Sequence, residues 1–210
     1  MIIKHTSRRN FFKITSITIT GLLGGAYTTV NGKSDGNEGW FKTLFGNSKN
    51  NKEPIPGIPQ SWVDFEGDVV YEYANYILDL KLKNITPQMV IAPHFKKRGS
   101  IKNTLPPKKL WKKMKPTLLV IDALSESMGT PINDIISAYR SPKYNRAVRG
   151  KSRSYHMSNQ AVDVTFKKSS PWRVAKVARH LRDKEKEFKG GIGTYRGFVH
   201  IDTRGQNVNW

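Results

Sequence analysis

Two short apolar stretches near the C-terminus each carry an ionisable side chain at a position that a strand would bury. In residues 161–165, strand alternation places Asp163 on the face opposite two valines. In residues 197–202, the same alternation places His200 and Asp202 on one face. An unpaired charge in a low-dielectric interior is too costly, so a buried carboxylate needs a partner or a metal ion. If these stretches are buried strands, their ionisable side chains therefore need such a partner.

A set of two imidazoles and one carboxylate is available for a metal, because His156 lies shortly before the first stretch. His156, Asp163 and His200 suit a tetrahedral zinc ion and leave one coordination position for water. Zinc lowers the pKa of that water, and the resulting hydroxide can attack an amide carbonyl that the ion polarises. The alternative is three ordinary surface or core side chains that form no site, and spacing alone leaves both interpretations open.

The chain has no cysteine. This excludes disulfides, thiolate metal ligands and a cysteine nucleophile, and it leaves histidine and carboxylates as the strong metal-binding side chains. Lys and Arg number 36 against 16 Asp and Glu, a formal charge of +20. Such a charge predicts a polyanionic partner, which could be nucleic acid, an anionic membrane surface or an acidic cell-wall polymer.

Residues 1–30 are typical of an export signal. Arg8 and Arg9 precede two phenylalanines and Lys13, and a weakly apolar run follows with no acidic residue before Asp35. The pattern resembles a twin-arginine signal, so we expect the twin-arginine export machinery as a partner and the periplasm or cell wall as the location. The apolar run is too short and polar for a comfortable membrane span of about 20 residues. Membrane contact is expected only through an uncleaved signal segment, and the alternative is a basic tail before a short buried helix.

The remaining chain divides into a linker and a globular domain. Residues 31–60 are rich in Asn, Lys, Gly, Ser and Pro and read as a tether, whereas residues 61–210 show globular patterning. We expect one helix at residues 69–80 and a second helix with Pro116 in its first turn and a stop at Gly129.

Two Ser-Pro pairs and one alternating segment complete the prediction. Ser141-Pro142 and Ser170-Pro171 each suit a helix N-cap followed by proline in the first turn. Residues 134–140 alternate as a strand that would place Ile136, Ala138 and Arg140 on one face. Helices between short strands, without a regular βαβ alternation, predict an α+β fold with a small antiparallel sheet that carries the zinc site and is flanked by helices.

Four motifs in order extend this interpretation. They are Tyr139-Arg140-Ser141-Pro142 with Asn145, then Ser154-x-His156 and Ala161-x-Asp163, then Gly190-Gly191-Ile-Gly193, then Phe198-Val-His200-Ile-Asp202-Thr203 with Trp210. From about residue 62 to 210 the chain resembles the YcbK-type murein endopeptidases, relatives of the zinc D-Ala-D-Ala carboxypeptidases in the lysostaphin/D-Ala-D-Ala/Sonic hedgehog zinc fold. The resemblance implies that His156, Asp163 and His200 bind Zn²⁺ and that the substrate is a peptide of peptidoglycan.

The resemblance also assigns roles to Arg140 and Ser154. Arg140 would lie near the ion, where its guanidinium could hold a substrate carboxylate or stabilise the oxyanion of the tetrahedral intermediate. Its alternative role is a structural pair with a buried acid. Ser154 would bind substrate or order its loop, and we favour the second.

Two positions depart from the wider family. Dipeptidase and carboxypeptidase relatives place an acid three residues before the last zinc histidine, where this chain, like the YcbK type, has none and carries Gly197. Asp202 could replace that acid as general base, or it could orient His200, and we predict the base role. Many relatives have glycine at the position of Asn159, which we expect to reshape the pocket rim.

The sequence therefore predicts an exported zinc metallopeptidase that cleaves cross-link or stem peptides of peptidoglycan, as an endopeptidase rather than a carboxypeptidase. The alternatives are a non-catalytic wall-binding module of the same fold and a basic nucleic-acid-binding protein. We find no RNA-binding motif or recognition helix, and we expect Trp111, among its lysines, to be a packing residue. Of the other histidines, His180 suits a solvated helix face and His94 could line the cleft.

Overall fold

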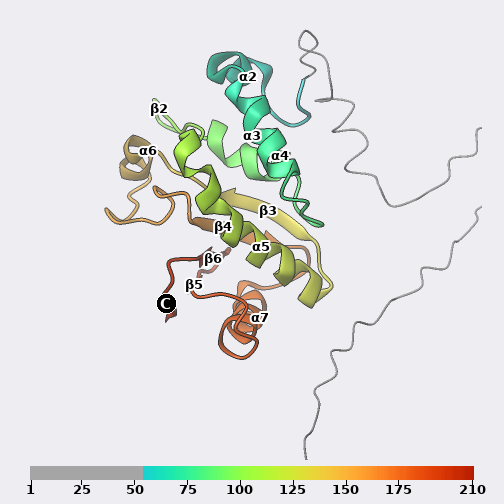
Figure 1. The fold of residues 1–210 in the computed structure, drawn as a ribbon. Helices are drawn as coiled ribbons and strands as arrows, with labels where there is room; N and C mark the ends of the chain where they lie inside the picture. The colour runs from blue at the N-terminus through green and yellow to red at the C-terminus, as the bar shows by residue number, and fades with distance from the viewer. Residues whose placement is uncertain (1–53) are drawn as a thin grey trace, which may run out of the picture. The chain divides into compact units, whose positions relative to one another are not determined.

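The computed structural model describes residues 54–210, which form an α+β fold (Figure 1). The signal expected at residues 1–30 and most of the expected linker lie outside the described residues. The helices are α2 (Gln60–Glu66), α3 (Val69–Leu78), α4 (Pro87–Ile91), α5 (Trp111–Met128), α6 (Pro142–Ala147) and α7 (Pro171–Asp183), with the short 3₁₀ helices η1 (Ala92–Phe95) and η2 (Lys108–Leu110). The strands are β1 (Lys97–Arg98), β2 (Ile101–Lys102), β3 (Ile132–Ser137), β4 (Ala161–Phe166), β5 (Gly191–Thr194), β6 (Val199–Asp202) and β7 (Val208–Asn209).

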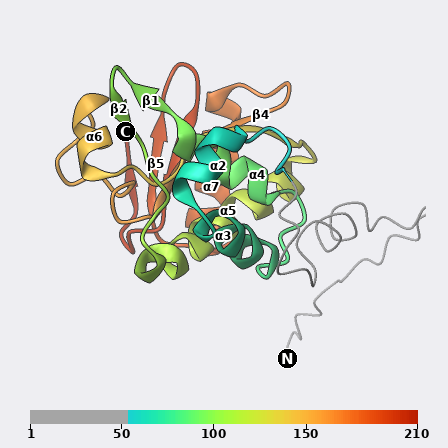
Figure 2. The same ribbon diagram turned by 90° about the horizontal axis from the view of Figure 1, so that it is seen from above.

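The main sheet has five strands in the order β3-β4-β6-β5-β7. Its first four strands pair antiparallel, and β7 joins β5 in parallel, so the sheet is mixed rather than purely antiparallel. A separate hairpin of β1 and β2 lies next to α6 (Figure 2). In the register of β4 and β6, Asp163 stands opposite His200. The two ionisable residues predicted to need a common partner are therefore neighbours.

The hydrophobic core forms between the helices and one face of the main sheet. Val162 and Val164 of β4 are fully buried in it, together with Leu118 and Ile121 of α5. Because side chains alternate along a strand, the core side of β4 takes the valines and the other side is left for Asp163. The core also includes Ile55, from the end of the segment that we expected to be a linker.

Helix α5 is the longest helix within residues 54–210, and it begins five residues before Pro116, which we predicted to lie in its first turn. Its first residue, Trp111, is buried and donates from Nε1 to the carbonyl of Pro106 at 2.9 Å. This packing stabilises the additional turn. Pro116 has no N–H to donate to the carbonyl of Lys112, but both residues are exposed, so the proline is tolerated inside the helix. The predicted stop is confirmed, since Gly129 closes α5 in the left-handed conformation.

Strand β3 ends three residues before Arg140, which therefore lies in the following loop. Its pairing with β4 shifts register twice, and Ile135 rather than Ile136 is buried. Such irregularities interrupt the alternation of a regular strand, so the strand predicted over residues 134–140 ends at Ser137, although Ile136 and Arg140 still line the same pocket. Both predicted helix caps are confirmed, because Ser141 and Ser170 each accept a hydrogen bond from a backbone N–H three residues later.

Candidate metal centre

His156, Asp163 and His200 converge on one point beside the main sheet. Asp163 Oδ1 lies 2.9 Å from His200 Nδ1 and 3.2 Å from His156 Nε2, and the two imidazole nitrogens are 3.2 Å apart. All three residues are buried. Asp163 and His200 come from adjacent strands, and His156 comes from the turn that leads into β4.

The hydrogen bonds behind the two imidazoles determine which nitrogens carry protons. His156 Nδ1 lies 2.6 Å from the carbonyl oxygen of Ala138, which can only accept. His200 Nε2 lies 3.1 Å from Oδ2 of Asp202, an ionised carboxylate that also only accepts. In their neutral forms, imidazoles held in this way direct the lone pairs of His156 Nε2 and His200 Nδ1 toward Oδ1 of Asp163. Three acceptors that face one another are the arrangement that a cation stabilises.

The spacing of the three donor atoms fits zinc. Ligand atoms at about 2.0–2.1 Å from a tetrahedral ion lie roughly 3.3 Å from one another, close to the separations of 2.9–3.2 Å found here. Two imidazoles and a carboxylate are also a common donor set of catalytic zinc sites, which keep a fourth position for water. The residues present therefore fit the ion that the sequence predicts.

The electrostatics of the cluster also favour positive charge at this point. Burial lowers the pKa of His156, despite the opposing attraction of Asp163. Burial alone would raise the pKa of Asp163, but His156 and His200 outweigh it and hold that pKa well below its usual range. Burial would lower the pKa of His200, but its interactions with the carboxylates of Asp163 and Asp202 outweigh burial and raise that pKa. The cluster thus keeps its carboxylate ionised.

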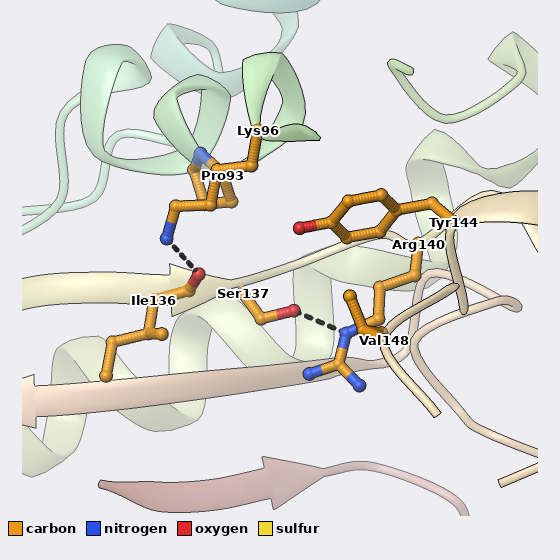
Figure 3. A pocket seen from close by; sticks show the side chains of 7 residues that line it. All are labelled: Pro93, Lys96, Ile136, Ser137, Arg140, Tyr144 and Val148. Carbon is orange, nitrogen blue, oxygen red and sulfur yellow. Dashed lines mark hydrogen bonds between the residues drawn. The ribbon is translucent and has the colours of Figure 1, made fainter. Parts of the chain in front are cut away.

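Arg140 forms the structural pair that was one of its two predicted roles. Its Nη2 donates to Oδ2 of Asp163 at 2.5 Å, and its Nε donates to Oγ of Ser137 at 2.8 Å. Asp163 therefore presents one oxygen to the imidazoles and the other to the guanidinium. The Arg140 side chain remains 19% exposed and lines a pocket next to the cluster (Figure 3). It can fix the carboxylate ligand while one edge stays accessible.

Asp202 contacts the edge of the His200 ring that faces away from the cluster. It is fully buried and accepts hydrogen bonds from His200 Nε2, from the Gly191 backbone and from Arg204. Burial would raise the pKa of Asp202, but Arg204, His200 and Gly191 outweigh it and lower that pKa well below its usual range. This carboxylate lies at His200 Nε2, whereas the cluster lies at His200 Nδ1. The geometry favours the orienting role over the base role that we predicted.

Ser154 and Asn159 belong to the turn structure that carries His156. Ser154 is partly buried, and its backbone N–H and C=O both form turn hydrogen bonds. Asn159 has φ +57°, a left-handed conformation that asparagine and glycine adopt most readily. Its buried side chain donates to the carbonyl of Leu110 at 3.0 Å, so it does not shape the pocket rim as expected. The shared backbone conformation explains why glycine or asparagine suits this position.

The structure adds one residue to the site that the sequence analysis left without a role. The indole of Trp210 lies 5.2 Å from the His200 ring, measured between centroids, and packs over strand β5. A Cβ on Gly193 would lie only 2.6 Å from the indole, so this position of β5 requires glycine. The signal was present as the Gly191-x-Gly193 alternation in a strand, which indicates close approach of another group.

The two other histidines among residues 54–210 lie apart from the cluster. His94 is fully buried, with Nδ1 3.1 Å from the carbonyl oxygen of Ile91, and it does not line the pocket although Lys96 does. Burial lowers the pKa of His94 to about 4. His180 lies on the exposed side of α7, 3.1 Å from Glu185, as predicted.

Comparison with known protein families places this site within a matched region. Residues 88–202 match the family described as Peptidase M15, and that segment is more than half of the chain. No curated protein and no solved structure gives a significant match. The matched segment contains the whole His156, Asp163 and His200 cluster. The chain belongs to the Peptidase M15 family, whose members are zinc-dependent peptidases.

Proposed function

We propose that this protein is an exported zinc metallopeptidase that hydrolyses cross-link or stem peptides of peptidoglycan, as an endopeptidase rather than a carboxypeptidase. The observation that carries the proposal is the buried cluster of three facing acceptors within the family-matched segment. The endopeptidase preference rests on the motifs shared with the YcbK type and on Gly197, where carboxypeptidase relatives have an acid.

The described residues suggest how the site would work. A zinc ion held by His156, Asp163 and His200 would polarise the scissile carbonyl and lower the pKa of a water molecule. Around it, Asp202 orients one imidazole and the Ala138 carbonyl orients the other. The exposed edge of the Arg140 guanidinium would stabilise the oxyanion that forms on the substrate.

One observation favours the second candidate, a wall-binding module without catalysis. Within residues 54–210, the carboxylate of the cluster and the one behind His200 both have partners: Asp163 contacts the imidazoles and Arg140, and Asp202 contacts His200 and Arg204. Neither is free to accept a proton as general base. The peptidase would therefore depend on a base from outside these two residues, whereas a binding module needs none.

Digestion of purified murein sacculi by the zinc-loaded protein separates the two candidates. We expect new soluble peptides by mass spectrometry, and their masses identify the scissile bond. His156→Ala should abolish hydrolysis and lower zinc occupancy, whereas the exposed control His180→Ala should keep both. Binding to sacculi without release of any peptide would support the binding module instead.

The export proposal rests on residues outside the described part of the chain. Within residues 54–210, no helix is long and apolar enough to cross a membrane. Replacing Arg8 and Arg9 by lysines keeps the charge but removes the paired guanidinium groups, so the precursor should stay in the cytoplasm. Cell fractionation measures this, and normal export of the variant would contradict the twin-arginine route.

A further inference from the structure

A second recognition element lies next to the metal centre. A pocket of about 220 Å³ opens beside Arg140, between the loop after β3, the 3₁₀ helix η1 and α6. Its polar lining consists of Lys96, Ser137, Arg140 and Tyr144 (Figure 3). Ile136 and Val148 contribute apolar walls, so the pocket offers both carbon surface and hydrogen-bond donors.

The positive charges of this pocket are not equivalent. The guanidinium of Arg140 is matched by the carboxylate of Asp163 at 2.5 Å. Lys96 instead donates to a neutral partner, the carbonyl oxygen of Ile136, at 2.6 Å. Among residues 54–210, no carboxylate forms an ion pair with Lys96, and no acidic side chain lines the pocket. The unmatched charge of the pocket is therefore that of Lys96.

The Lys96 ammonium also has donors to spare. An ammonium carries three N–H groups, and the Ile136 carbonyl uses one of them. Figure 3 shows the hydroxyl of Tyr144 directed into the same space as the ammonium, across the pocket from the Ser137 hydroxyl. A carboxylate placed there would accept charge-assisted hydrogen bonds from Lys96 and a further bond from Tyr144.

We propose that this pocket recognises a free carboxylate on an amino acid of the substrate peptide, adjacent to the bond that is cleaved. Lys96 is the charge partner and Tyr144 the second donor. Arg140 stands between the pocket and the metal cluster, so it sets the distance from the carboxylate to the scissile bond. This inference rests on the proposed peptidase function and adds to it a preference for peptides in which that carboxylate is not amidated.

The test uses cross-linked stem peptides in which one carboxylate at a time is converted to the carboxamide. Dissociation constants are measured by calorimetry on the zinc-loaded full chain, and kcat/KM is measured by chromatography. At one carboxylate position the wild type should bind the free form about 10-fold more tightly than the amide, the effect of one charge-assisted hydrogen bond.

The variants assign that preference to the pocket. Lys96→Met should bind the free and amidated peptides alike, and Lys96→Arg should keep much of the discrimination. Tyr144→Phe should weaken binding of the free form by roughly 3-fold, less than the loss of a charged partner. Lys97→Met, which removes an exposed lysine next in the chain but outside the pocket lining, should behave as wild type.

Equal binding of all free and amidated peptides by the wild type would overturn the proposal, as would an unchanged preference in Lys96→Met. If wild type binds with the preference but cleaves nothing, the peptidase proposal fails and the pocket assignment stands. If it cleaves both forms equally, the peptidase proposal stands and the pocket assignment fails. If Lys96→Met fails to fold because it loses the hydrogen bond to the Ile136 carbonyl, Lys96→Arg and the wild-type comparison of free and amidated peptides test the proposal.

Discussion

Asp202→Asn tests how the metal ligand His200 is held. Asp202 accepts hydrogen bonds from His200 Nε2 at 3.1 Å, from Gly191 N at 3.1 Å and from Arg204 Nε at 2.8 Å. Asparagine keeps one acceptor oxygen, replaces the other by an NH₂ group and removes the negative charge. The imidazole then loses the carboxylate that fixes its tautomer. Loss of such a partner typically weakens metal binding by about 10- to 100-fold, which is about 1.4 to 2.7 kcal/mol.

The assay is zinc affinity by competition with a chelator, together with murein hydrolysis at saturating zinc. We expect weaker zinc binding in Asp202→Asn and substantial recovery of hydrolysis when zinc is in excess. Asp183→Asn is the matched control, because it removes a carboxylate from Arg182 but touches no ligand of the cluster. Unchanged zinc affinity with a loss of hydrolysis of roughly 100-fold or more would refute the orienting role and restore the base role.

Two further predictions concern His94 and the strand beneath Trp210. His94 titrates at about 4 in the fold but near 6.5 when unfolded, so its contribution to stability is present above pH 6.5 and is lost as pH falls toward 4. That loss amounts to about 3 kcal/mol. In urea unfolding of the zinc-free protein, the free energy of unfolding should therefore fall less steeply with decreasing pH in His94→Phe than in the wild type. Parallel pH dependences would contradict the assignment. Gly193→Ala should displace the Trp210 indole from His200 and lower zinc affinity in the chelator assay. The control Gly197→Ala, where an added Cβ meets nothing within 4 Å, should leave zinc affinity unchanged. Equal zinc affinity in both variants would show that the indole does not support His200.

Local rules predicted the elements that hold the site, because their causes are local. The Ser141 and Ser170 caps follow from hydrogen bonds within a single turn, and the sequence shows both partners of each bond. The meeting of Asp163 with His200 follows from strand alternation and the cost of a buried charge. The start of α5 escaped prediction because the buried Trp111, a tertiary contact, outweighs the preference of proline for a first turn.

The roles of the charged residues around the cluster depend on orientation, which the spacing of residues does not determine. Alternation correctly puts Asp202 on the strand face of His200, and that adjacency suits a base and an orienting group equally well. The choice depends on which ring edge meets the carboxylate. Arg204 and the Gly191 backbone hold Asp202 at the outer edge, and Asp163 approaches the inner one. The His200 imidazole thus lies between Asp163 and Asp202. Of these two carboxylates, Asp163 is the one that also contacts His156.

The second imidazole is oriented by a group even more remote in the sequence. The carbonyl of Ala138, 18 residues before His156, accepts from its Nδ1 and leaves Nε2 for the cluster. That carbonyl lies just after β3, where the register shifts move the chain out of regular alternation. The same irregular segment carries Arg140 to Asp163. The irregularity of β3 therefore positions two groups. It places the Ala138 carbonyl beside His156 and the Arg140 guanidinium beside Asp163. A change that restored regular pairing there should perturb zinc binding without altering any of the three ligands.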